Sequence, residues 1–182
     1  FSGGYLIFGT TNGSAELADL DADGDLDVFM GSDTGPSKVF NYLNVGVGAI
    51  SDSGQTLAPA GKEVALGDLD GDGDIDAILS NATTPSSTIF FNDGAGNFTS
   101  IQTLTEGGDV VVGDIDGDGD LDALLTNGTA THNSTILRND GSGSFSVTGI
   151  NLGDATSGEL GDVDGDGDLD AFLVDDATGT NA

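Results

Sequence analysis

Four stretches of the sequence each place five aspartates within nine residues. They read DLDADGDLD at 19–27, DLDGDGDID at 68–76, DIDGDGDLD at 114–122 and DVDGDGDLD at 162–170. Carboxylates occupy positions 1, 3, 5, 7 and 9 of each stretch, and a glycine occupies position 6. Aspartates at 1, 3 and 5 followed by this glycine match the first half of an EF-hand calcium loop, where position 7 lends its backbone carbonyl. The spacing therefore predicts four calcium-binding loops.

The second half of each loop departs from the EF-hand pattern. An EF-hand carries a bidentate glutamate at position 12, whereas these loops have apolar residues there: Met30, Leu79, Leu125 and Leu173. We therefore expect the aspartate at position 9 to supply the last carboxylate. An all-oxygen set with six or more ligands favours calcium over magnesium, which retains more of its waters. Ligand type alone leaves manganese open.

All five aspartates of each loop are candidate metal ligands, and we expect about four calcium ions. The candidates are Asp19, Asp21, Asp23, Asp25, Asp27, Asp68, Asp70, Asp72, Asp74, Asp76, Asp114, Asp116, Asp118, Asp120, Asp122, Asp162, Asp164, Asp166, Asp168 and Asp170. Two carboxylates about 4 Å apart repel by roughly 4 kcal/mol at an effective dielectric of 20. Solvated acidic turns are the alternative interpretation, but four such turns in register with a repeat favour a cation.

Composition narrows the possible partners. The 182 residues include 32 acidic and 3 basic side chains, a net charge of −29, and twenty of the acids lie in the four loops. Nucleic acids and anionic membranes attract lysine and arginine, so neither is an expected partner. With no cysteine and a single histidine, disulfides and zinc sites are not expected. No apolar run is long enough to insert into a membrane. Lys38, Lys62 and Arg138 are interpreted as isolated solubilising charges.

The loops are part of a longer repeat. Their first aspartates fall at 19, 68, 114 and 162, which gives spacings of 49, 46 and 48 residues. Each unit has four short apolar, β-branched or aromatic segments, and in the middle units an Asn-Asp-Gly turn joins the last two. For the second unit the segments are 64–66, 77–79, 88–91 and 98–104; later counterparts include 110–112, 123–125, 135–138, 145–150 and 171–174. The pattern predicts an all-β chain of about four antiparallel four-stranded units, the blades of a β-propeller. A β-sandwich is the alternative.

Repeated DxDxDGxxD loops between the first two strands of a blade resemble the FG-GAP repeats of integrin α-subunit propellers. The repeat length of about 48 residues and the GDxDGDGDxDA motif are more similar to those of the bacterial FG-GAP-like (VCBS-type) repeats. The resemblance implies that Asp19, Asp21, Asp23 and Asp27 bind one calcium through side chains and Asp25 through its carbonyl, with the later loops matching position for position. It also implies an extracellular or cell-surface protein. The phenylalanine-glycine and glycine-alanine-proline signatures are not visible in each repeat, and such propellers usually have about seven blades.

The distance of each chain end from the nearest acidic loop indicates which strands the first and last units contain. Residues 1–8 have the spacing of a fourth strand, and the last loop is followed by 12 residues, too few for a third strand. We therefore expect one repeat domain over 1–182 with an incomplete unit at each terminus. It would belong to a larger propeller or array, or neighbouring copies would complete it by strand addition.

Other features are weaker signals. Five Asn-x-Ser/Thr sequons, at Asn12, Asn81, Asn97, Asn127 and Asn133, are candidate glycosylation sites. Loop composition alone also explains them. No nucleophile–base pair or phosphate loop is found, so we expect no enzyme. The favoured function is a calcium-stabilised extracellular structural or adhesion protein that neighbouring copies complete by strand addition into a fibre or closed propeller. Glycans or a surface receptor are further candidate partners. The alternative is a carbohydrate-binding or carbohydrate-cleaving propeller domain.

Overall fold

The computed structural model describes residues 13–43, 49–127 and 133–175, and this part of the chain contains strands and no helix. The strands are β1 Ala15–Ala18, β2 Asp27–Met30, β3 Lys38–Leu43, β4 Ala49–Asp52, β5 Glu63–Gly67, β6 Asp76–Asn81, β7 Ser86–Asn92, β8 Phe98–Leu104, β9 Asp109–Gly113, β10 Asp122–Thr126, β11 Thr135–Asn139, β12 Phe145–Val147, β13 Ser157–Gly161 and β14 Asp170–Val174. The described residues hold no helix long and apolar enough to cross a membrane. The predicted strand at 1–8, Asn12 and residues 44–48 lie outside the described ranges.

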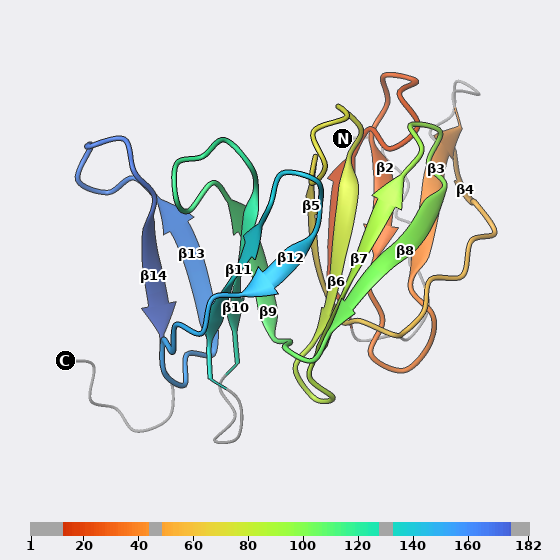
Figure 1. The fold of residues 1–182 in the computed structure, drawn as a ribbon. Coiled ribbons are helices and arrows are strands. Elements are labelled where there is room, and N and C mark those ends of the chain that lie inside the picture. The colour runs from red at the N-terminus through yellow and green to blue at the C-terminus, as the bar shows by residue number, and fades with distance from the viewer. Residues whose placement is uncertain (1–12, 44–48, 128–132, 176–182) are drawn as a thin grey trace, which may run out of the picture.

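The strands form four antiparallel sheets in chain order. β1–β4, β5–β8 and β9–β12 are four-stranded meanders, and β13 and β14 form a two-stranded sheet. The sheets stand side by side, with the β1–β4 sheet and the β13–β14 pair at opposite ends (Figure 1). The predicted all-β fold of four-stranded repeat units is thus confirmed. Among the described residues, the sheets do not close into a ring.

Strand positions follow the sequence pattern because the second strand of each of the first three units is buried along nearly its whole length. Every residue of β6 is buried, whereas the outer strand β8 has buried Phe98 followed by three exposed residues. One predicted strand is shorter than expected. The segment 145–150 forms a strand only over β12, and Gly149 beyond it has a φ of +74°, which an extended strand does not tolerate.

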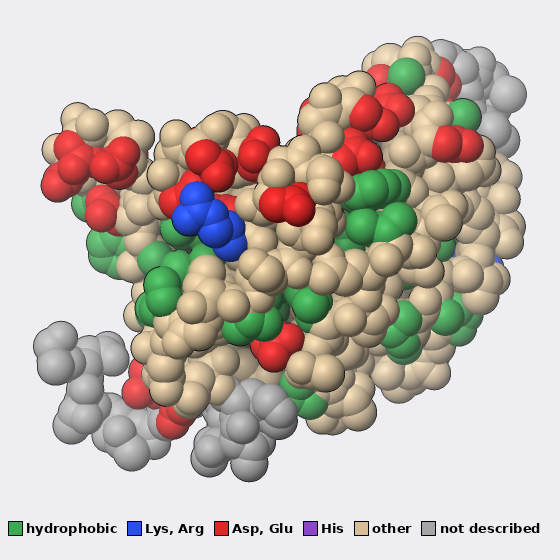
Figure 2. Space-filling model, in the orientation of Figure 1, with side chains coloured by type: hydrophobic (Ala, Val, Ile, Leu, Met, Phe, Trp, Pro, Cys, Tyr) green, Lys and Arg blue, Asp and Glu red, His purple; other side chains and the backbone are tan. Residues whose placement is uncertain are grey.

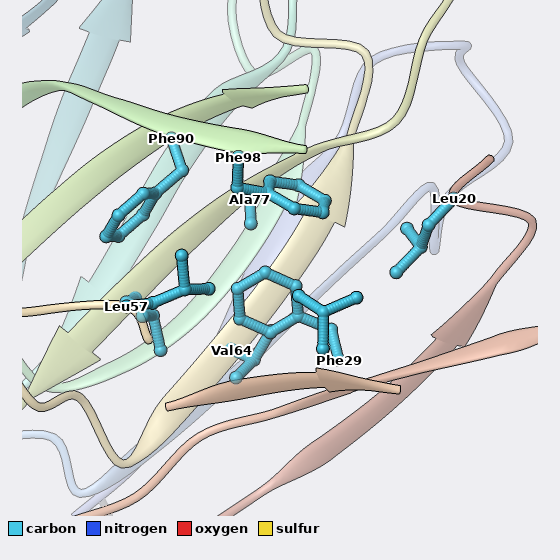
Figure 3. Close-up of a cluster of buried hydrophobic side chains, with 9 residues drawn as sticks. Leu20, Phe29, Leu57, Val64, Ala77, Phe90 and Phe98 are labelled. Carbon is cyan, nitrogen blue, oxygen red and sulfur yellow. The ribbon is translucent and has the colours of Figure 1, made fainter. Parts of the chain in front are cut away.

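The hydrophobic cores lie between consecutive units. One cluster joins Leu20 and Phe29 of the first unit to Val64, Ala77 and Phe98 of the second (Figure 3). The rings of Phe29 and Phe98 meet edge to face with centroids 5.1 Å apart. A second cluster repeats the arrangement between the second and third units, where Ile78 and Leu69 pack near Ala123 and Phe145. Each unit is therefore stabilised largely by its neighbour, as in other repeat proteins.

All four acidic loops connect the first and second strands of their sheets. They follow β1, β5, β9 and β13 and lie along one edge of the molecule, the upper edge in Figure 1. In the space-filling view, acidic side chains gather along this same edge (Figure 2). The predicted placement of each loop within a β-hairpin is confirmed, because β1 pairs with β2, β5 with β6, β9 with β10 and β13 with β14.

Candidate metal centres

Within each loop, aspartate side chains hydrogen-bond to nearby backbone N–H groups. In the second loop, Asp68 accepts from the N–H groups of Gly71 and Gly73 at 2.8 and 3.1 Å. Asp70 and Asp72 each accept from the N–H two residues further on, at 3.2 and 2.9 Å. The third and fourth loops repeat all four bonds. Such Asx-type bonds are local, so the nine-residue sequence is sufficient to specify this turn.

The loops require left-handed backbone at two positions. At position 6 the glycines have φ between +93° and +99°, a region that a side chain strongly disfavours. Position 4 is also left-handed, and it is glycine in three loops. In the first loop it is Ala22, with a φ of +58°, the one described non-glycine residue with positive φ. The first loop is therefore the most strained of the four.

The aspartate at position 9 has a different environment from the others. Asp76 is fully buried and accepts from the N–H of Leu69 at 3.0 Å and from the N–H of Asn92 at 2.8 Å. Asp122 accepts in the same way from the third unit's Ile115 and Asn139, at 3.3 and 2.9 Å. This aspartate joins the acidic loop to the third strand of its own sheet, so it combines a structural role with its predicted ligand role.

Three carboxylates converge in every loop. In each group, one oxygen from each residue lies within 4.8 Å of the others. The groups are Asp19, Asp21 and Asp27; Asp68, Asp70 and Asp76; Asp114, Asp116 and Asp118; and Asp162, Asp164 and Asp170. Positions 1, 3 and 9 thus come together in three loops, and positions 1, 3 and 5 in the third. The predicted ligands outside these groups are Asp23, Asp72, Asp122 and Asp166, and the aspartates at position 7: Asp25, Asp74, Asp120 and Asp168.

Burial and neighbouring carboxylates raise the pKa values of several aspartates in the second and third loops. Burial raises the pKa of Asp76 to about 6, and the nearby charges of Asp70 and Asp72 push it in the same direction. Burial also raises the pKa values of Asp70 and Asp122, again with a contribution from neighbouring aspartates. These shifts arise mainly because burial disfavours the ionised form of a carboxyl group, and the neighbouring negative charges add to the effect. A bound cation would favour the ionised form and offset both effects.

The third loop contains a cation of its own. The guanidinium of Arg138, on β11, forms ion pairs with Asp116 and Asp118, the latter at 3.2 Å. Figure 2 shows basic side-chain atoms among the acidic ones on this edge. The interpretation of Arg138 as an isolated solubilising charge is therefore wrong. It is also wrong for Lys38 and Lys62, which form ion pairs with Asp52 and Glu63 at 3.0 and 2.7 Å. The equivalent position on β7 is Phe91, because Leu137 and Phe90 face Ala123 and Ala77 at matching registers.

Comparison with known proteins agrees with this geometry. The sequence profile described as "FG-GAP-like repeat" matches three times, over residues 19–79, 68–125 and 114–173. Together the three matches span most of the chain. The chain belongs to the FG-GAP-like repeat family. The resemblance drawn from the aspartate loops is confirmed. No curated protein matches the chain.

Among solved structures, the FG-GAP-like chain is similar to part of the crystal structure of the V. cholerae biofilm matrix protein Bap1. The match has a TM-score of 0.49 and 20% sequence identity, and it covers 90% of this chain and 28% of that chain. The chain therefore spans less than a third of the length of the protein it matches.

The donor set of the FG-GAP-like loops fits a hard divalent cation. All converging atoms are carboxylate oxygens, which calcium prefers and soft metals do not. In the first loop, Asp25 Oδ2 is buried and has no hydrogen-bond partner among the described residues. A buried carboxylate oxygen without a donor is costly unless a cation is close. The fit is least direct in the third loop, where Arg138 already neutralises part of the charge.

Two residues that contact the loops were not identified from the sequence as part of the site. The sequence pattern predicts only hairpin turns at Asn92 and Asn139, yet both residues are buried and contact the acidic loops. Their signal was present, because each stands at the start of the Asn-Asp-Gly turn in the two middle units. Turn propensity alone accounts for such a triplet, so the triplet by itself does not predict a contact with the acidic loops.

The structure describes the asparagines of four of the five sequons. Asn97 and Asn133 are exposed. Asn81 and Asn127 are buried, and their side-chain amides donate to the carbonyls of Ala60 and Gly107. A glycan is bulky and must project into solvent, so the burial of these two side chains argues against their glycosylation in the folded protein.

Proposed function

We propose that this FG-GAP-like repeat protein binds about four calcium ions, one in each acidic loop, and acts outside the cell as a structural or adhesive element. The observation that carries the proposal is the convergence of three carboxylates at equivalent places in all four hairpins. The residues that would hold each ion are the groups given above, completed by position 5 or 9 and by the carbonyl at position 7. Calcium would supply the positive charge that these carboxylates lack.

Calcium would act as a structural ion. Each loop joins the two strands that pack against the neighbouring unit, so ordering the loop also orders the interface between units. A ligand that binds only the folded state stabilises it by about 2.7 kcal/mol per site when present at a hundred times its Kd. Four such sites would contribute a large part of the stability of a domain of this size.

A melting experiment with and without a chelator tests the proposal. We expect excess EDTA to lower the melting temperature by more than 10 °C, because several sites are lost together. Calcium, added back in excess, should restore it, and isothermal titration should count about four ions. Magnesium at the same concentration is the matched control and should restore little. Identical melting temperatures in EDTA and in calcium would contradict the assignment of calcium.

The expectation that the protein is not an enzyme is part of the same proposal. Glycoside hydrolysis usually requires two carboxyl groups across the scissile bond. One pocket, between the second and third units, has Glu106 as its single acidic residue. A second pocket is lined by two glutamates, Glu16 and Glu159, which lie on different units among mostly apolar strand residues. No observation favours carbohydrate binding or cleavage over the structural role.

The proposed partner is another repeat unit, from a neighbouring copy or from a longer chain. β2, β6 and β10 each pair with a third strand, but among the described residues β14 has no strand on its outer side. Phe172 of β14 is 57% exposed, whereas the equivalent Ile78 and Leu124 are fully buried against the following unit. An apolar face of this kind and an open strand edge both favour strand addition.

Light scattering of the calcium-loaded protein tests this partner. We expect concentration-dependent assemblies that Phe172→Ser disperses. Ile101→Ser is the matched control, because Ile101 is an exposed apolar residue on the outer strand β8. A monodisperse monomer at all concentrations would rule out assembly between copies of this chain.

A further inference from the structure

A buried asparagine connects the first acidic loop to the second. The side-chain amide of Asn92 donates to the carbonyl of Leu20, in the first loop, at 2.8 Å and to the carbonyl of Ile75, in the second loop, at 3.1 Å. Its backbone N–H donates to the carboxylate of Asp76 at 2.8 Å. One residue on β7 therefore contacts two different candidate metal loops.

Asn139 repeats this arrangement one unit later. Its amide donates to the carbonyls of Leu69 and Leu121, at 2.8 and 3.1 Å, and its N–H donates to Asp122 at 2.9 Å. Leu69 belongs to the second loop and Leu121 to the third. The same three bonds thus join the second loop to the third, so the bridge is a property of the repeat and not an accident of one site.

The two bridges form a continuous hydrogen-bonded path. In the second loop, the N–H of Leu69 donates to Asp76 while its carbonyl accepts from Asn139. In the first loop, the N–H of Leu20 donates to Asp27 at 3.0 Å while its carbonyl accepts from Asn92. A position-9 carboxylate and the next unit's asparagine are therefore held by the same loop residue. When a loop adopts its folded conformation, its leucine carbonyl is positioned to accept the hydrogen bond from the asparagine of the following unit.

The path is shielded from water. Leu20 and Leu69 are each 1% exposed, and Asn92 and Asn139 are 5% and 2% exposed. Hydrogen bonds in such surroundings are stronger than in water, and an unpaired buried amide is costly. A loop that loses its folded conformation would therefore disturb the bridge and, through it, the neighbouring loop.

We infer that Asn92 and Asn139 couple calcium binding in the first three loops, so that an ion in one loop raises the affinity of the adjoining loop. The inference rests on the proposed calcium binding and extends it from four ions to an ordered, cooperative set. The bridges pre-order the neighbouring loop, and a pre-ordered site loses less conformational freedom on binding. The fourth loop is different: among the described residues, no asparagine joins the third loop to it. It should bind independently.

Disabling one loop at a time measures the coupling by isothermal calcium titration of the chelator-stripped protein. Asp70→Asn with Asp72→Asn disables the second loop, and Asp164→Asn with Asp166→Asn makes the same change in the fourth. Both variants should lose one ion. Loss of the second loop should weaken the first and third about fivefold, a typical coupling. Loss of the fourth should leave the other three as in the wild type.

Equal residual affinities in these two variants would overturn the inference. They would mean either independent sites or a cooperativity that is global and does not pass through the bridges. A wild-type protein that binds no calcium at all would instead overturn the proposed function, so the two failures are distinguishable.

Removing one bridge provides the second test. Asn139→Ala should reduce the coupling between the second and third loops while all four ions still bind. Asn97→Ala is the matched control, because Asn97 lies in the equivalent hairpin turn of the second unit but its side-chain amide donates to Asp93 of the same turn and, among the described hydrogen bonds, to no acidic loop. Circular dichroism reports whether each variant folds. If Asn139→Ala does not fold, the comparison of the disabled loops decides the question alone.

Discussion

The second and fourth acidic loops are nearly identical in sequence but differ in their surroundings. They differ only in the apolar residues at positions 2 and 8, and they make the same local hydrogen bonds. Yet Asp76 is fully buried while Asp170 is exposed, and Leu69 is 1% exposed while Val163 is 63% exposed. The turn is therefore a property of nine residues, whereas the environment of the ninth carboxylate depends on the third strand and on the next unit.

Removing the carboxylate at position 9 should produce the largest difference in stability between the two loops. In calcium, Asp76→Ala should destabilise the protein by roughly 3 kcal/mol, because the N–H groups of Leu69 and Asn92 lose their buried acceptor and an ion loses a ligand. Asp170→Ala also removes a candidate ion ligand but should cost less, roughly 1 kcal/mol, because Asp170 is exposed and its printed hydrogen bond among the described residues comes from Val163 alone. Urea unfolding measures both. Equal losses would contradict the claim that the surroundings distinguish the two loops.

The third loop differs from the second through Arg138. A guanidinium that pairs with Asp116 and Asp118 must give way before an ion can use both carboxylates. We expect Arg138→Leu to strengthen calcium binding at the third loop by about tenfold, roughly 1.4 kcal/mol. Phe91→Leu, at the equivalent place in the second unit, is the control and should leave affinity unchanged. Unchanged titrations for Arg138→Leu would mean that the ion and the arginine do not compete.

Stability at acid pH separates the buried loops from the exposed one in the absence of calcium. The pKa of Asp76 is about 6 in the folded protein, above its ordinary 3.8, so the folded state binds more protons between these values. In EDTA, lowering the pH from 7 to 5 should therefore stabilise the protein by about 1 kcal/mol, seen as a rise of roughly 3 °C in melting temperature.

Two controls sharpen the pH experiment. With excess calcium the trend should reverse, because protons then compete with the ion for the same carboxylates. Asp76→Asn should remove most of the rise in EDTA, whereas Asp170→Asn should keep it. A melting temperature in EDTA that falls between pH 7 and pH 5 would contradict the direction of the Asp76 shift.

The sequence was sufficient for the repeat, the strands and the position of the loops because each depends on local or periodic signals. The alternation of aspartates specifies its own backbone bonds, and the apolar segments 64–66 and 77–79 lie within β5 and β6. The bridges of Asn92 and Asn139 could not be predicted in this way. Their partners Leu20 and Leu69 lie 72 and 70 residues away, in another unit, and are brought close only by the stacking of sheets.

The ion pairs of Arg138 with the third loop could not be predicted from the sequence either. Arg138 lies 20 residues from Asp118, with a loop and a strand between them. Charge counts along the chain identify it only as a lone basic residue in an acidic protein. Its pairing with Asp116 and Asp118 follows from the register of β10 against β11, which places it beside the loop of its own unit. Registers are set by packing, so this contact becomes visible only in three dimensions.

The smallest expected effect concerns the first loop, which differs from the other loops in the residue that adopts the left-handed backbone conformation at position 4. Ala22 has a φ of +58°, at a position that is glycine in the other loops. Ala22→Gly should stabilise the protein by about 0.5–1 kcal/mol, since the relief of steric strain outweighs the extra freedom of glycine in the unfolded chain. Gly71→Ala, with a φ of +78° at the same position of the second loop, should destabilise it by a similar amount. Thermal melts of both variants in calcium measure the pair. Shifts of the same sign would mean that the first loop has adapted to its alanine, and the four loops would then differ in backbone preference as well as in surroundings.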